Sequence, residues 1–211
     1  MYVGRIVAIA RTPTGKASGL YRVSSRSFPN REAKILENSV AVLPKAGHED
    51  DIYENPYIAY NCIRIVDRFA VVSNGSHTDF IAEKLQDGMS MRDAVITVLH
   101  AMDFEHDALN TPRIAGIVDD RSDEACLGIV TNAGLHVQRL QVQSGTAGYV
   151  ATYEHVTPGS HRENAYDAES AADACQFILG HGVFAELERP ITAACAVADG
   201  AGGYEIAVAD A

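Results

Sequence analysis

Three arginines and three serines lie close together in the segment 21–31, although the whole chain has a formal net charge of −11 at pH 7. Guanidinium groups and hydroxyls are the side chains that suit phosphate oxygens, so a local cation cluster on an acidic chain indicates a specific anion site. An ordinary polar strand and turn would use the same residues. The polar side chains of this run are Arg22, Ser24, Ser25, Arg26, Ser27, Asn30 and Arg31.

Carboxylates gather in a second segment, 102–107, which holds Asp103, Glu105 and Asp107 and is followed by Asn110 and Arg113. Neighbouring carboxylates repel one another, and partial burial raises their pKa further. A carboxylate in that state can act as a general base. The alternative is a solvated acidic turn between a helix and the next strand.

Two further polar clusters precede the acidic segment. In segment 55–61, Tyr60 and Asn61 are adjacent, so on a strand they face opposite ways and one of them packs inside the fold. Segment 73–79 lies where a strand leads into a helix, and amides at a helix start bind anions or carbonyls. A helix cap with a turn explains the second cluster equally well. Its polar members are Asn74, Gly75, Ser76, His77 and Thr78.

Common metal and cofactor motifs are missing. The eight histidines have no zinc-binding spacing, and no phosphate-binding glycine loop or nucleophile elbow is present. We therefore expect a mechanism with no metal and no cofactor. The cysteines are widely spaced in apolar contexts, which predicts buried, reduced thiols in a cytoplasmic protein: Cys62, Cys126, Cys175 and Cys195.

The bulk composition limits the partners. A length of 211 residues with 47% hydrophobic residues fits a single domain, 1–211, with a substantial core. The acidic balance argues against nucleic-acid binding, which needs basic surfaces, and against docking on anionic membranes. No apolar run reaches the length of a membrane span.

The hydrophobic pattern predicts mostly strands, with helices in blocks. Ser90, with Asp93 three residues later, caps the clearest helix, and Asp167 is expected to cap the last one. The turn at 66–69 predicts an antiparallel hairpin. The helices are expected at 78–86, 90–102 and 168–179, and the strands at 3–10, 21–25, 40–43, 58–66, 69–73, 113–118, 125–131, 135–142, 148–153, 192–198 and 204–209.

This order of elements predicts the α+β class. Hairpin-linked strands give mainly antiparallel sheets, and the helices must cover them. Two sheets stacked face to face with the helices outside would bury every apolar strand. The fold class is therefore a four-layer αββα sandwich.

The polar clusters taken together resemble the archaeal-type IMP cyclohydrolase family. The resemblance extends over the full length, and its motifs are long and unusual. They lie at residues 22–31, 55–62, 73–79, 102–105 and 110–113, with matching ends at 1–5 and 190–194.

The resemblance implies a fold and a reaction. The fold is that of the N-terminal nucleophile (NTN) hydrolases, which matches the layered sandwich. The reaction closes 5-formamidoimidazole-4-carboxamide ribonucleotide (FAICAR) to inosine monophosphate (IMP), the last step of purine synthesis. Met1 and Tyr2 provide no N-terminal nucleophile, so the fold is expected without hydrolase chemistry.

The resemblance also implies roles for the polar clusters. Glu105 matches the family's catalytic base, and Arg31 matches the arginine that stabilises the formyl oxygen. Strand alternation would place Arg22, Ser24 and Arg26 on one face, gripping the phosphate, with Ser25 on the other. Tyr60 and Asn61 are expected to bind base or ribose. The other implied contacts are Ser27, Asn30, Asn74, Gly75, Ser76, His77, Thr78, Asn110 and Arg113.

Two other functions stay open at this level. One is an amidohydrolase of the NTN class, which would need a processed N-terminus. The other is a purine-nucleotide sensor that binds the ligand without converting it. The family relation also favours a homo-oligomer.

Overall fold

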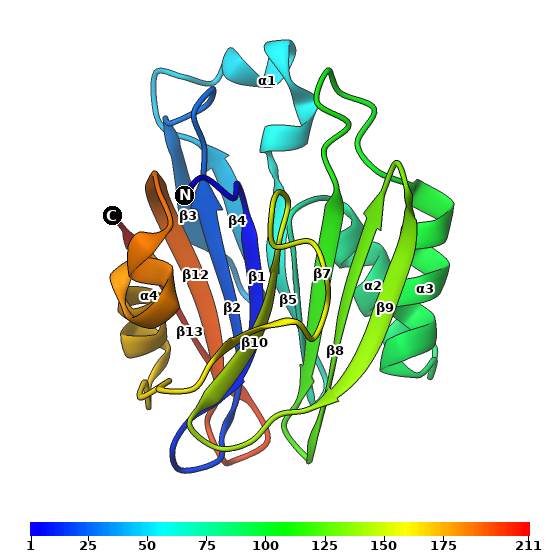
Figure 1. The fold of residues 1–211 in the computed structure, drawn as a ribbon, viewed down its shortest axis with the longest axis vertical. Coiled ribbons are helices and arrows are strands. Elements are labelled where there is room, and N and C mark those ends of the chain that lie inside the picture. Colours follow the sequence, from blue (N-terminus) through cyan, green and yellow to red (C-terminus); the bar gives the residue numbers. More distant parts are fainter.

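A computed structural model describes residues 1–211 as two antiparallel sheets packed face to face (Figure 1). The six-stranded sheet has the order β11-β10-β1-β2-β12-β13. Its strands are β1 (Ile6–Arg11), β2 (Ala17–Ser24), β10 (Thr146–Ala151), β11 (His161–Glu163), β12 (Pro190–Ala198) and β13 (Tyr204–Asp210).

The seven-stranded sheet follows the chain more simply, with the order β3-β4-β5-β6-β7-β8-β9. Each strand pairs with the next strand in the sequence, and the connection between them is a hairpin, a loop or a segment that contains helices. The strands are β3 (Arg31–Ile35), β4 (Ser39–Pro44), β5 (Tyr60–Val66), β6 (Phe69–Ser73), β7 (Arg113–Asp119), β8 (Ser122–Thr131) and β9 (Gly134–Gln141).

Helices cover both outer faces. On the six-stranded sheet lies α4 (Ala171–Gly180), and on the seven-stranded sheet lie α2 (His77–Gln86) and α3 (Met91–Met102) (Figure 1). The short helix α1 (Asp51–Glu54) lies at one end of the sandwich, and the 3₁₀ turns η1 (Pro56–Ile58) and η2 (Gly182–Glu186) complete the elements. No helix has the length and apolar character that crossing a membrane requires.

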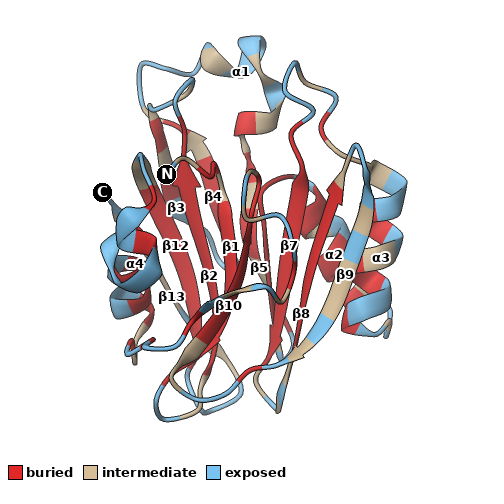
Figure 2. Cartoon of the chain, viewed as in Figure 1, coloured by how far each residue is buried: buried red, intermediate tan, exposed pale blue.

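Strand alternation explains the layers. On β1, Val7 and Ile9 belong to the core between the sheets, whereas Ile6 and Ala8 pack toward α4. Because successive side chains point to opposite faces, an unbroken apolar strand supplies two cores at once. The strands in the middle of both sheets are therefore buried on both faces, and exposed residues concentrate on edge strands such as β9 (Figure 2).

The predicted fold class and most predicted elements are confirmed. Val66 pairs with Phe69 across a tight turn in which Asp67 has a φ of 49°, as expected for a two-residue hairpin. Ser90 caps α3 by accepting a hydrogen bond from the Asp93 amide. All four cysteines are buried and free.

Some boundaries differ from the sequence prediction. The last helix begins at Ala171, and its cap is Ser170, which accepts from the Asp173 amide, rather than Asp167. The strands β3 and β11 were not predicted. Both lie at sheet edges and carry several charged residues, so they lack the apolar alternation that identifies a strand.

Candidate active site

One end of the sandwich gathers the polar side chains that the two sheets bring together. Here β1, β3, β5 and β7 begin and β2 and β10 end, and α1 and the loop after α3 lie over this end (Figure 1). A cavity of about 60 Å³ opens between them. It is lined by Tyr2, Arg5, Ser25, Ser27, Phe28, Arg31, Asn55, Tyr57, Ile58, Glu105, Asp107, Leu109, Thr111 and Tyr153.

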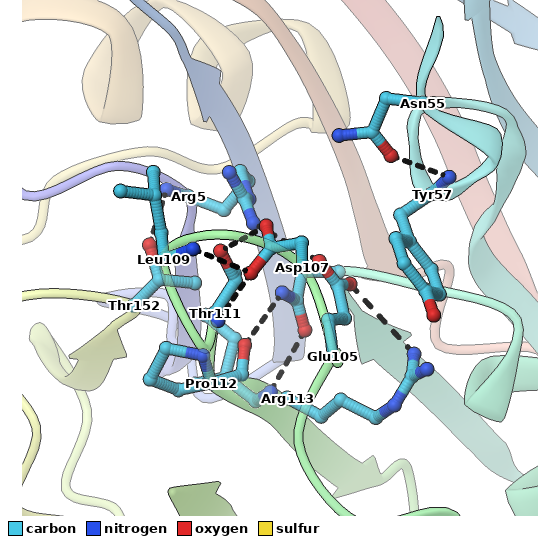
Figure 3. Close-up of polar contacts among 12 residues, drawn as sticks. Arg5, Asn55, Tyr57, Glu105, Asp107, Leu109, Thr111, Pro112, Arg113 and Thr152 are labelled. Carbon is cyan, nitrogen blue, oxygen red and sulfur yellow. Dashed lines mark hydrogen bonds and ion pairs between the residues drawn. The ribbon is translucent and has the colours of Figure 1, made fainter. Parts of the chain in front are cut away.

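Glu105 lies in this cavity between two arginines, with only 2% of its side chain exposed. Its Oε2 is 3.6 Å from Arg5 Nη2, and its Oε1 is 3.7 Å from Arg113 Nη1 (Figure 3). Both distances are longer than a hydrogen bond. Oε1 is buried and has no hydrogen-bond partner in the protein. The carboxylate thus has a free acceptor inside the cavity.

The surroundings bring the pKa of Glu105 to about 7. Burial raises the pKa, and the positive charges of Arg5 and Arg113 oppose the rise without cancelling it. Burial alone would lower the pKa of Arg5, but Glu105 and the hydroxyls of Tyr60 and Tyr21 outweigh burial and raise it. A carboxyl group with a pKa near neutrality can take up and return a proton under physiological conditions.

The loop that carries Glu105 is held by Asp107. The Asp107 carboxylate accepts hydrogen bonds from the Leu109 amide at 3.2 Å and from the amide and hydroxyl of Thr111, each at 2.8 Å (Figure 3). The Glu105 amide in turn donates to the Thr111 carbonyl at 2.8 Å. These bonds hold the Glu105 loop in place although the segment has no regular secondary structure.

Arg31 shares the cavity with Glu105. It is 2% exposed at the first residue of β3, and its Nε donates to the Phe28 carbonyl at 3.2 Å. Its charge is among those that lower the pKa of Glu105. The two residues that the resemblance named as catalytic therefore lie at one site, although 74 positions separate them in the sequence.

Tyr60 lies on the side of β5 that faces the other sheet. Its hydroxyl forms a 2.6 Å hydrogen bond with the Tyr21 hydroxyl. Burial raises the pKa of Tyr60, and Arg31 and Arg5 act against this rise. This tyrosine pair lies beside the same arginines that surround Glu105.

The comparisons with known proteins identify the chain's relatives. Residues 2–202 match the family described as IMP cyclohydrolase-like protein. This chain belongs to that family. It is 49% identical to the IMP cyclohydrolase of Methanosphaera stadtmanae over 196 residues, covering 93% of this chain and 94% of the relative. It is 42% identical to the IMP cyclohydrolase of Methanocaldococcus jannaschii over 200 residues, covering 94% and 95%.

In this member of the IMP cyclohydrolase family, Arg22 and Ser24 do not reach the cavity. They share one face of β2, as alternation predicts, but that face looks toward α4 while Tyr21 and Val23 look toward the other sheet. Arg22 is fully buried and donates to backbone carbonyls at the end of α4 and around η2: Ile178, Leu179, Phe184, Leu187 and Glu188. The position predicted for a phosphate contact is thus a structural one.

Of the rest of the arginine and serine run, Ser25, Ser27 and Arg31 line the cavity. Ser25, on the face opposite Arg22, lines it together with Ser27. Arg26 lies at the exposed edge, 4.3 Å above the Tyr2 ring and 3.3 Å from the Glu188 carboxylate. Asn30 contacts His48, 3.2 Å away and outside the cavity lining.

Asn61 also lies outside the cavity. Tyr60 and Asn61 face opposite ways, as predicted, and Asn61 donates to Asp79 on α2 at 2.9 Å, beside the Arg64–Asp79 ion pair. Asn110 has a φ of 48° at the exposed tip of the Glu105 loop and does not line the cavity.

The strand-to-helix junction at 73–79 holds the backbone on both sides of Arg113 by hydrogen bonds. Asn74 bonds the Pro112 carbonyl and the Ile114 amide, and His77 bonds the Ile114 carbonyl. A Cβ at Gly75 would come within 2.9 Å of Arg113 Nη1. Burial lowers the pKa of His77 to about 3, so its ring is neutral. Of the other members, Thr78 bonds Ser73 and the Gly75 carbonyl, and Ser76 is exposed ahead of α2.

Several cavity residues were not predicted from the sequence as site residues. Arg5 belongs to the N-terminal motif of the family resemblance, which was the available signal. Tyr57 and Thr111 lie within the family motifs at 55–62 and 110–113 but were not singled out there, and Tyr153 had no signal, because only the fold brings it to Glu105.

A larger groove of about 990 Å³ lies away from this site, between the start of α3 and the β5–β6 and β7–β8 turns. Three of its four arginines are paired with carboxylates: Arg68 with Asp119, Arg92 with Asp93 and Arg139 with Glu124. It contains no buried, unpartnered reactive group comparable to Glu105.

Proposed function

We propose that the chain is an IMP cyclohydrolase that closes FAICAR to IMP with loss of water. The observation that carries the proposal is the buried, unpartnered Oε1 of Glu105, in one cavity with Arg31. The names of the methanogen relatives, which match over most of the chain, support the same reaction.

Ring closure needs a base for a weak nucleophile. The carboxamide nitrogen of the substrate attacks the formyl carbon of the same molecule, and Glu105 takes a proton from that nitrogen. A pKa of about 7 suits this transfer, because a substantial fraction of Glu105 is ionised at neutral pH and the protonated form is stable enough to persist. The cavity contributes further by holding both arms of the substrate in a reactive geometry.

Charge on the formyl oxygen needs a cation. As the new C–N bond forms, the formyl oxygen becomes negative, and the Arg31 guanidinium stabilises it. Glu105 returns its proton to this oxygen to give a hydroxyl. The hydroxyl then leaves as water together with the hydrogen of the formamido nitrogen, which forms the C=N bond and completes the aromatic ring. Arg5 and Arg113 keep the carboxylate in place between these steps.

The 5′-phosphate is assigned to the open edge of the cavity. Arg26 is exposed there, and Ser25 and Ser27 line the wall beside it. This assignment replaces Arg22 and Ser24, whose donors face α4. Arg26→Ala should therefore raise the KM for the nucleotide more than it lowers kcat.

The decisive experiment is turnover of purified protein with FAICAR, followed by the absorbance change as IMP forms. We expect conversion by the natural sequence and none by Arg31→Ala or Glu105→Gln. Binding of IMP without any conversion of FAICAR by the natural sequence would refute the enzyme and favour a nucleotide sensor.

We further propose that the two-sheet sandwich shares the NTN hydrolase architecture, and that one domain, 1–211, acts as a homo-oligomer in the cytoplasm. The layer order of helix, sheet, sheet and helix supports the NTN hydrolase architecture. The continuous cores on both sides of the sheets support a single domain. The four reduced cysteines suit the compartment. Light scattering on the protein as it elutes from a size-exclusion column measures its mass in solution. A mass equal to that of one chain would refute the homo-oligomer.

A further inference from the structure

A chain of three hydrogen-bonded side chains runs from the Glu105 loop to the cavity wall. Asp107 Oδ2 accepts from the Thr111 hydroxyl at 2.8 Å, and Thr111 Oγ1 lies 3.0 Å from the Tyr153 hydroxyl. Thr111 is 1% exposed, and all three residues line the cavity. None of these residues has a role in the proposed chemistry so far.

The number of hydrogens available decides which group donates in each of these two hydrogen bonds. A carboxylate can only accept, and a hydroxyl has one hydrogen to give. The Thr111 hydrogen goes to Asp107. The bond between Thr111 and Tyr153 must therefore be donated by Tyr153. The Tyr153 hydrogen points away from the ligand space, and only the lone pairs of its oxygen are available to a ligand.

The surrounding contacts keep this direction fixed. Asp107 Oδ1 accepts two backbone amides, from Leu109 and Thr111, so the carboxylate cannot turn. The Tyr153 ring stacks on Tyr2 with centroids 6.1 Å apart. Gly4 also lies close to the ring, since a Cβ there would come within 2.9 Å of it. Tyr153 is thus an acceptor with little freedom to become a donor.

We propose that Tyr153 binds the nucleotide by accepting a hydrogen bond from it, and that Asp107 and Thr111 are positioning residues that set this polarity. The inference rests on the proposed function and adds a specificity element to it. A purine ribonucleotide offers two kinds of donor, an N–H of the base or carboxamide and a hydroxyl of the ribose. Tyr153 would reject a ligand that presents an acceptor at the same place.

Asp107→Asn tests the polarity directly. The asparagine oxygen must stay on the two backbone amides, so its NH₂ group takes the place of Oδ2 and donates to Thr111. Thr111 then donates to Tyr153, and the Tyr153 hydroxyl turns its hydrogen toward the ligand. We expect this variant to bind IMP roughly 10-fold or more weakly, because donor meets donor.

Matched variants distinguish a reversed hydrogen bond at Tyr153 from a general loss of structure at the site. Thr111→Ser keeps the hydroxyl that links Asp107 to Tyr153, so it should bind IMP like the natural sequence. Tyr153→Phe removes the acceptor without reversing it, so its loss should be smaller than that of Asp107→Asn. Melting temperatures measured in parallel show that each variant is folded. Equal IMP affinity in Asp107→Asn and the natural sequence, with both folded, would overturn the proposal.

Ligand analogues identify which donor Tyr153 meets. Calorimetry with IMP, its N1-methyl derivative and its 2′- and 3′-deoxy derivatives gives one dissociation constant for each ligand and variant. The analogue that lacks the relevant donor should bind the natural sequence more weakly and should lose nothing further in Tyr153→Phe. If every analogue stays equally sensitive to Tyr153→Phe, the proposal is wrong. If the natural sequence neither binds IMP nor converts FAICAR, the proposed function fails, and this inference fails with it.

Discussion

Replacing Glu105 by Gln should abolish turnover and at the same time make the folded protein more stable at alkaline pH. The change keeps the size of the side chain and removes only its ability to ionise. In the native protein Glu105 is 2% exposed, and burial brings its pKa to about 7 from an ordinary value of 4.5. The native state therefore holds a proton that the unfolded chain releases at lower pH.

The size of the effect follows from this difference. The two states differ in the pKa of Glu105 by about 2.5, and each pKa unit corresponds to about 1.4 kcal/mol. The unfolded state binds fewer protons between pH 4.5 and pH 7, so stability falls as the pH rises through this window. The contribution of Glu105 is fully present below pH 4.5, and about 3 kcal/mol of it is lost above pH 7.

Urea unfolding of both proteins at a series of pH values measures this quantity. The free energy of unfolding of Glu105→Gln minus that of the natural sequence should grow by about 3 kcal/mol from pH 4.5 to pH 8. In the natural enzyme, kcat/KM should rise over the same range with an apparent pKa of about 7, because the base must be ionised. A stability difference that does not change with pH would refute the buried, pKa-shifted carboxylate. Substantial turnover by Glu105→Gln would refute its role as the base.

Three further outcomes test the surroundings of the site. Arg22→Met should lower the free energy of unfolding by about 3 kcal/mol, because it leaves several buried carbonyls without donors, while kcat of the folded protein stays the same. Gly116→Ala and Gly128→Ala should each cost about 1–3 kcal/mol through overpacking, but only Gly116→Ala, which pushes against β1, should also lower kcat. IMP should slow hydrogen exchange in residues 103–112, because the 60 Å³ cavity is well below the roughly 300–1,000 Å³ of ligand pockets and its rim has to rearrange. Unchanged exchange on IMP binding would refute that rearrangement.

Local patterns predicted much of the fold, and the prediction is limited where contacts between distant parts of the sequence decide the structure. The pairing of Arg22 with Ser24 and the opposition of Tyr60 and Asn61 both follow from strand alternation. Alternation does not say which face looks into the cavity. On β2 that choice depends on α4, which lies about 150 residues away in the sequence and supplies the carbonyls that hold Arg22. The structure therefore places Ser25 and Ser27 of this polar run at the cavity wall, and Arg22 and Ser24 away from it.

Glu105 and Arg31 show the opposite case. Glu105 and Arg31 were named from the family resemblance, and the fold brings both to one cavity. Arg5 was missed as a partner of Glu105 because its contact joins residues 100 positions apart. The strand that begins at Arg31 was missed as well, since it is a charged edge strand that is paired on one side only.

The site depends on the packing between the two sheets, because both sheets supply charges to it. Arg5 directly precedes β1 in the six-stranded sheet. Arg113 begins β7 in the other sheet, and Glu105 lies in the loop that leads from α3 to β7. The two strands touch where Gly116 faces Val7, and a Cβ there would come within 2.8 Å of the Val7 methyl group. That contact lies only a few residues from both arginines. A side chain at Gly116 would therefore push β1 and β7 apart at this contact, and with them Arg5 and the Glu105 carboxylate, which lie 3.6 Å apart. Gly128, on the neighbouring strand, packs against Val95 of α3 instead, so a methyl group there disturbs a helix and leaves this spacing intact.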